Sequence, residues 1–222
     1  MQTKQRIKIL TDILMTILSV FLMGGTILFP NDRVHQILGM TLCALWILHV
    51  VLNNRWFSSI FKGKHSPYRI MQIFVNLGVG LSALCLMISG LMMAWFLPVL
   101  NGLGIARVMH LVCSHWYYIF MCFHLGLHLG IIIFKLNLAT NRINRKMKIF
   151  LSIILGLICA YGIYAFIQRG IWKYVFLSQE FFFFDLERGF ILFLLDYISI
   201  LILIATVSYY LGKFLQQKSK KR

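Results

Sequence analysis

Six long apolar runs limit what this chain can fold into. They cover roughly residues 8–29, 35–56, 68–97, 107–134, 148–168 and 189–212 of the 222 residues. A run of about 20 apolar residues spans the hydrocarbon core of a bilayer as one helix. Only 13% of the residues are charged, about half of the fraction in an ordinary soluble domain. The sequence therefore predicts an all-α integral membrane protein with six transmembrane helices.

The basic residues are distributed unevenly between the two ends of these runs. The net charge is +16, and all but five of the 22 Lys and Arg precede the first run, follow the sixth, or lie in the second-to-third and fourth-to-fifth connections. This positive-inside pattern places both termini in the cytoplasm of a multi-pass plasma-membrane protein. We expect the basic loops to meet anionic lipid head groups of the bilayer, and not nucleic acid.

The second and fourth runs share a histidine spacing. In each run an arginine, Arg33 or Arg107, is followed within three residues by a histidine, and another histidine stands 14 residues further on. The two pairs are His35 with His49 and His110 with His124. The chain is therefore interpreted as a four-helix core over residues 1–135, made of a duplicated helical hairpin. A two-helix extension over residues 136–222 follows, with an aromatic-rich outer connection.

Helix geometry gives this spacing a structural meaning. At about 100° and 1.5 Å per residue, 14 residues return a side chain to within about 40° of its first face, about 21 Å along the axis. Short connections make neighbouring helices antiparallel, so the second and fourth runs are parallel. We therefore expect His35 to face His110 near the outer surface. His49 is expected to face His124 nearer the cytoplasm.

Two imidazoles that face each other across a flat gap suit a haem iron ligated on both sides. A zinc ion fits less well, because it prefers four ligands clustered around one point. The cysteines form no CxxCH motif, so covalent haem attachment is not expected. The spacing thus predicts two non-covalent haem b groups and electron transfer across the membrane. Their iron ligands are His35, His49, His110 and His124.

Other polar residues have more than one possible role. His128 competes with His124 as the inner ligand, and it is otherwise a candidate for contact with a quinone or a propionate or for proton transfer. Arg33 and Arg107 are candidates to bind haem propionates, or are interfacial arginines that snorkel to the head groups. His115 is expected to point away from the haem face into the core. No catalytic residue is assigned.

Three features outside the histidine pairs also leave alternatives open. Asp196 lies inside the sixth run, where it serves proton handling near a quinone or pairs with Arg188 or a tyrosine hydroxyl. The FFFF segment at 181–184 is an interfacial belt or a docking patch for an extracytoplasmic partner. Glycines of the first and third runs allow either porphyrin approach or close helix packing. They are Gly24, Gly25, Gly78, Gly80 and Gly90.

The stretch VHQILGMTLCALWILHVVLNNRWF resembles the signature of the flavinylation-associated cytochrome family, long known as a domain of unknown function. The matching positions are His35, Leu38-Gly39, His49, Leu52-Asn53 and Trp56, and HLGLH at 124–128 resembles the second half. Asn54 replaces a common tryptophan, and Gln36 stands where an acidic residue is frequent. The resemblance covers about residues 8–135.

The resemblance implies a membrane cytochrome similar to the b-type subunits of respiratory dehydrogenases and hydrogenases. Such a protein passes electrons from the quinone pool, or from a cytoplasmic donor, to a flavin-bearing partner outside the cell. Whether it also oxidises quinol, and so counts as an enzyme, stays open. The alternative from another class is a metal-ion transporter or channel lined by histidines, and a third is an assembly subunit without a cofactor.

Overall fold

The computed structural model describes residues 2–25, 28–29, 31–59, 66–97, 104–139, 144–182 and 189–220, and all regular structure within them is helical. The helices are α1 (Gln2–Leu22), α2 (Asp32–Leu52), α3 (Asn54–Ser59), α4 (Pro67–Met92), α5 (Gly104–Ala139), α6 (Arg145–Gln168), α7 (Ile171–Val175) and α8 (Gly189–Lys220). Each apolar run coincides with one long helix. The two short helices, α3 and α7, were not expected from the sequence.

Four of these helices are long and apolar enough to cross a membrane. They are α2, α4, α6 and α8, found among the described residues. The prediction of a helical membrane protein is confirmed at this level. The other two expected spans coincide with α1 and α5. Charged residues, among them Lys8 and Asp12, lie within α1. A count of six spans therefore stays a prediction.

Local sequence fixes several helix ends. The Asn31 side chain accepts a hydrogen bond from the backbone N–H of Arg33 and so caps α2. Ser66 accepts from the N–H of Arg69 at the start of α4, and Pro67 occupies the first turn, where its missing N–H costs nothing. These caps set the residues at which α2 and α4 begin. The start of each helix determines how far along the helix axis each later residue lies.

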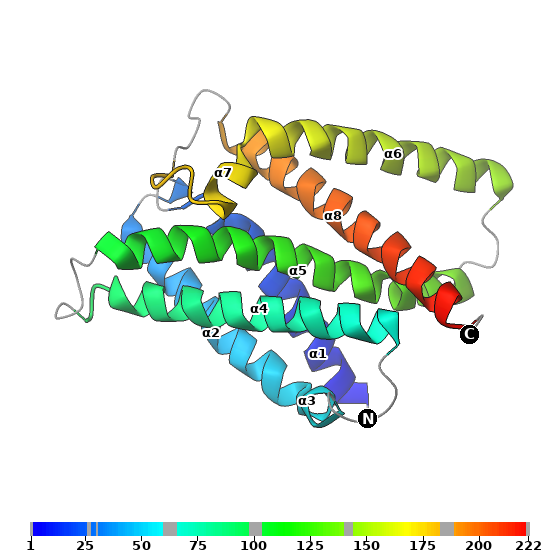
Figure 1. Ribbon diagram of the computed structural model, residues 1–222, viewed down its shortest axis with the longest axis horizontal. Coiled ribbons are helices and arrows are strands. Elements are labelled where there is room, and N and C mark those ends of the chain that lie inside the picture. The colour runs from blue at the N-terminus through cyan, green and yellow to red at the C-terminus, as the bar shows by residue number, and fades with distance from the viewer. Residues whose placement is uncertain are drawn as a thin grey trace.

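The first five helices form two antiparallel hairpins. α1 packs against α2, and α4 packs against α5, while α2 and α5 run in the same direction (Figure 1). The N- and C-termini lie at the same end of the molecule (Figure 1). Two hairpins with parallel histidine-bearing helices are consistent with the arrangement that the histidine spacing predicts, and their origin by duplication stays a prediction. This packing brings the two histidine-bearing helices into parallel register.

The C-terminal helices pack onto the hairpins. α8 crosses α5, and α6 lies along α8 on the outside (Figure 1). Glycines permit these close approaches. A Cβ at Gly162 would lie 2.6 Å from the Ser199 carbonyl oxygen, and a Cβ at Gly126 would overlap the backbone of Ala205. Small residues at helix contacts are typical of membrane proteins, since they let the backbones approach.

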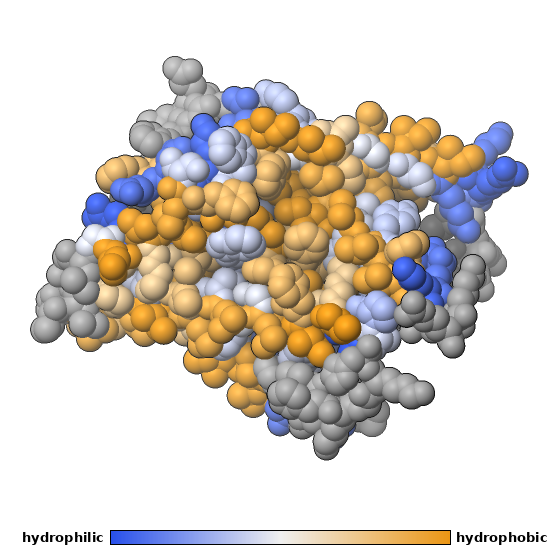
Figure 2. All heavy atoms as spheres, viewed as in Figure 1, coloured by the Kyte–Doolittle hydropathy of each residue, from blue (hydrophilic) through white to orange (hydrophobic). Residues whose placement is uncertain are grey.

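A single buried cluster joins both parts of the chain. Tyr118 of α5 is fully buried, and so are Phe193 and Ile200 of α8; all three belong to one hydrophobic cluster that includes Val20 of α1. Large apolar side chains cover the middle of the face seen in Figure 2, and hydrophilic residues gather toward the two ends of its long axis. Such an apolar belt matches the hydrocarbon core of a bilayer.

Candidate functional site

The pair of His35 and His110, called the outer pair because it is expected near the outer surface, lies between α2 and α5. The ring centroids of His35 and His110 are 6.3 Å apart, and their planes meet at 66°. His35 belongs to the first hairpin and His110 to the second. The structure therefore brings together the two residues that the spacing predicts to face each other.

Ser89 of α4 orients one ring of this pair. Its hydroxyl lies 2.8 Å from the Cys85 carbonyl and 3.0 Å from that of Leu86, so it donates its proton to the backbone. The same oxygen lies 3.2 Å from His110 Nδ1 and must therefore accept from the Nδ1–H group. The proton of the neutral ring sits on Nδ1, and Nε2 keeps its lone pair.

The other ring of the outer pair is less well fixed. Nδ1 of His35 is buried and finds no hydrogen-bond partner among the described residues. The Phe29 ring packs beside it at a centroid distance of 5.8 Å. An unpaired buried nitrogen costs about 1–3 kcal/mol. The outer pair thus contains one ring held by a neutral hydroxyl and one ring without such a partner.

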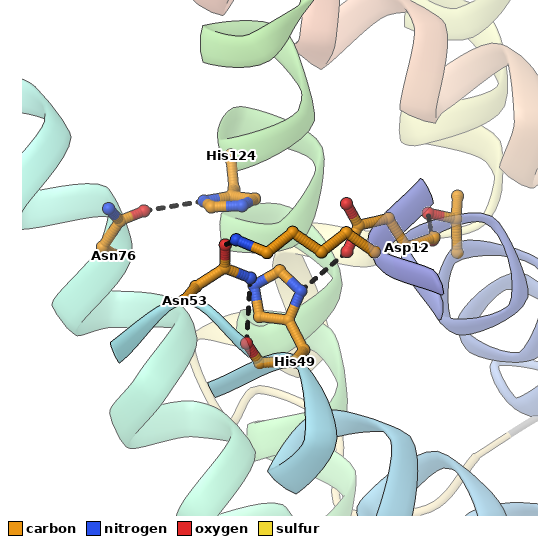
Figure 3. Close-up of polar contacts among 7 residues, drawn as sticks. Asp12, His49, Asn53, Asn76 and His124 are labelled. Carbon is orange, nitrogen blue, oxygen red and sulfur yellow. Dashed lines mark hydrogen bonds and ion pairs between the residues drawn. The ribbon is translucent and has the colours of Figure 1, made fainter. Parts of the chain in front are cut away.

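The inner histidine pair has the same separation and better-defined partners (Figure 3). The centroids of His49 and His124 are 6.3 Å apart, with planes at 75°. Oδ1 of Asp12, from α1, lies 2.7 Å from His49 Nδ1. Oδ1 of Asn76, from α4, lies 2.6 Å from His124 Nδ1. Both oxygens are acceptors, so Nδ1 carries the proton in both rings and Nε2 keeps the lone pair.

Two further contacts hold this end of the first hairpin. Lys8 Nζ donates to Asn53 Oδ1 at 2.9 Å, and Asn53 Nδ2 donates to the His49 carbonyl at 2.9 Å. Asn53 is also the C-cap of α2. These bonds tie α1 to the end of α2 and keep Asp12 beside His49 (Figure 3).

The separation of the rings matches a metal ion held between them. Metal–imidazole bonds of about 2.0–2.1 Å place two axial nitrogens about 4 Å apart and the ring centroids roughly 6 Å apart. Nδ1 bonds to an oxygen, which fixes the ring and frees Nε2, are the usual support of a metal-binding histidine. Three of the four histidines have this support. The donor set therefore fits a haem iron with two axial imidazoles.

Two glycines of the hairpins have open space beside them. The described residues of α2 pack chiefly against α1 and make little direct contact with α5. Gly39 lies one turn beyond His35, and a Cβ there would meet nothing within 4 Å; the same holds for Gly80 of α4. Gly78 instead makes room for the Phe120 ring, and a Cβ at Gly90 would rest 3.5 Å from His110.

Two further histidines within the described residues, His115 and His128, lie off these two pairs. The His128 ring is 4.7 Å from that of His124 and is exposed, so it is a neighbour of the inner pair. His115 is 1% exposed and stacks on Tyr174 at 4.4 Å, a core position as expected. Its Nδ1 donates to the Leu111 carbonyl, but its Nε2 is buried without a partner among the described residues.

The two arginines expected near haem propionates are exposed at the outer ends of their helices. The Arg33 guanidinium lies 5.3 Å from the centroid of the Trp95 ring, within the range of a cation–π contact. Arg107 is exposed in the first turn of α5. Contact of either residue with a propionate stays a prediction.

Asp196 is part of a buried ion pair. It is fully buried, with Oδ2 2.8 Å from Arg169 Nε and Oδ1 2.6 Å from the Tyr161 hydroxyl. The expected tyrosine contact is therefore present. Arg188, the expected cationic partner, lies outside the described residues, as do Phe183 and Phe184 of the aromatic segment. The cation that pairs with Asp196 is Arg169, the C-cap residue of α6.

Sequence reasoning missed the three side chains that orient the rings, Asp12, Ser89 and Asn76. Each is a polar residue inside an otherwise apolar helix, and such residues are expensive in a membrane unless they have a task. The presence of these polar residues could therefore be read from the sequence. What the sequence did not supply was the pairing, because Asp12 and His49 are 37 positions apart and meet only through hairpin packing.

Within the described residues, no group of three or more His, Cys, Asp or Glu is placed to hold a metal ion. A scan with protein-family models finds no match to this chain, and searches of curated proteins and of solved structures find none either.

Proposed function

We propose that this protein is a transmembrane electron-transfer cytochrome with two bis-histidine haem b sites. His35 and His110 hold the outer haem, and His49 and His124 hold the inner one. In this proposal all six long helices span the plasma membrane, with both termini in the cytoplasm. Haem bound at each pair would supply reversible one-electron chemistry.

The observation that carries the proposal is the repeated geometry of the two pairs. Each pair comes from the same two parallel helices, and each has a centroid separation of 6.3 Å. The 14-residue spacing separates the pairs by about 21 Å along the helices. A single facing pair has many structural explanations. Two equal pairs, with Nδ1 protons fixed on three rings, favour two equal ligand sites.

The protein's own residues do three things in this proposal. Ser89, Asn76 and Asp12 bond to Nδ1 of three imidazoles, which would leave Nε2 of each ring for the metal. The apolar helices exclude water from both sites. Arg33 and Arg107 neutralise propionates at the outer boundary. The electron donor is a membrane quinol or a cytoplasmic reductant, and the acceptor is a flavin-bearing extracytoplasmic partner.

Absorption spectroscopy tests the proposal. We expect a dithionite-reduced minus oxidised spectrum of the purified protein to show b-type bands, with two haems per chain by pyridine haemochrome assay. His35→Ala and His49→Ala should each lower the content toward one haem. Folded, pure protein that stays colourless after expression with ample haem would refute the proposal.

His128→Ala is the matched control. It removes a histidine one turn from His124 that the proposal does not use as a ligand, so the haem content should stay at two per chain. Equal losses for His128→Ala and His124→Ala would mean that the inner ligand has been assigned wrongly.

A further inference from the structure

The four oriented imidazoles differ in the charge of their Nδ1 partners. His110 has a neutral hydroxyl and His124 a neutral amide oxygen. Nδ1 of His35 has no hydrogen-bond partner among the described residues. His49 alone among these four bonds to a carboxylate, Asp12, at 2.7 Å. The two sites have the same ring separation, but only in the inner site does a carboxylate bond to one of the four described rings.

A carboxylate partner changes the ligand that it holds. The negative oxygen draws the Nδ1 proton toward itself, so the imidazole gains anionic character and becomes a more basic donor at Nε2. A more electron-rich ligand stabilises the oxidised, more positive state of a metal. Hydrogen bonding around the ligands is therefore one of the ways in which a protein sets a haem potential.

The contact between Asp12 and His49 joins α1 to α2, and a second hydrogen bond between the same two helices lies next to it. Lys8, one turn before Asp12, is directed to Asn53 at the end of α2. Among the described residues, the ion pair of the Asp12 carboxylate is the one with His49. The Asp12 side chain is 48% exposed, and that of His49 is 26% exposed.

We propose that Asp12 is a positioning residue that holds the inner site at a lower midpoint potential than the outer site, so that electron transfer runs downhill from the cytoplasmic side to the outer side. This inference rests on the proposed function. With haem held by both pairs, one electron would pass from the inner site, which would be oxidised, to the outer site, which would be reduced. No bond is made or broken. A quinol or cytoplasmic reductant resupplies the inner site, and an outer flavin reoxidises the outer one.

A redox titration of the purified holoprotein tests this inference. The wild-type protein should show two midpoint potentials, and the lower one should disappear in His49→Ala protein, which keeps only the outer haem. Asp12→Asn keeps the shape of the side chain and removes its charge. We expect it to raise the lower potential and to leave the higher potential in place. Asp12→Glu, which restores the carboxylate, should keep the lower potential near its wild-type value.

Lys8→Gln is the matched control for charge alone. It also removes one charge near the inner site, while the glutamine amide can still donate to Asn53, which is the contact that Lys8 makes in place of the ring. If the hydrogen bond to His49 sets the inner midpoint potential, Asp12→Asn should shift that potential much more than Lys8→Gln does. Shifts of equal size and opposite sign would overturn the inference, because they would show a field effect without a role for the bond.

Other outcomes are equally clear. Two haems with potentials that Asp12→Asn does not move would refute the inference and leave the proposed function standing. Protein without haem would refute the proposed function first. If Asp12→Asn protein loses its inner haem, Asn76→Asp decides the question, since a carboxylate on His124 should lower the inner potential further. No change in Asn76→Asp protein would refute the inference.

Discussion

The buried pair of Asp196 and Arg169 allows a quantitative prediction. Replacing Asp196 with Leu removes the carboxylate that bonds Arg169 Nε and the Tyr161 hydroxyl, and leaves a guanidinium that is 9% exposed without its counter-charge. Breaking a buried ion pair from one side costs about 3–5 kcal/mol. We expect Asp196→Leu to lower the free energy of unfolding by about that amount.

The assay is reversible unfolding in mixed detergent micelles, followed by circular dichroism, on a double-mutant cycle. Arg169→Leu alone leaves a fully buried carboxylate and should cost a similar amount. The double variant leaves no unpaired charge, and apolar replacement of a whole buried pair is often neutral or stabilising. It should therefore be more stable than either single variant. A double variant whose loss equals the sum of the single losses would refute the reasoning, because the two residues would then not be coupled.

Two other packing and positioning contacts give further predictions. Gly162→Leu should cost about 1–3 kcal/mol of unfolding free energy, since the side chain would collide with the Ser199 carbonyl. Gly156→Leu should be tolerated, because a Cβ at that position meets nothing within 4 Å. Equal losses for the two variants in the same detergent assay would contradict the α6–α8 contact. Ser89→Ala removes the acceptor of His110 Nδ1 and should weaken haem retention at the outer pair by about 10–100-fold in a haem-transfer assay. Ser89→Thr should retain most of the affinity, and unchanged retention in Ser89→Ala would exclude this support.

The long helices were predictable because hydrophobic length is a local property of the sequence. All six apolar runs coincide with helices, and Ser66-Pro67 marks the start of α4 as proline chemistry predicts. The facing of His35 with His110 was also predictable, since helix periodicity fixes which residues share a face. Short helices such as α7 carry too little periodicity to be recognised.

The partners of the histidines were not predictable in the same way. The angle at which two helices cross decides whether Asp12 reaches His49, and side-chain packing along the whole hairpin sets that angle. The same applies to Asp196, which pairs with Arg169 because α6 and α8 approach closely at Gly162. Sequence spacing identifies residues on one helix face, but it does not give the register between two helices.

The sparse contact between α2 and α5 has a consequence for assembly. Leu42 is the buried residue of α2, and the helix adheres mainly to α1. The second hairpin shares a continuous core with α8, and Val20 and Met23 at the end of the first hairpin's α1 belong to the same cluster. We expect the second hairpin, the C-terminal helices and α1 to form a stable platform first, with α2 the helix that moves most easily relative to α5. Under the proposed function, a flat apolar cofactor would then enter sideways from the lipid, and ligation by the histidines would hold α2 against α5.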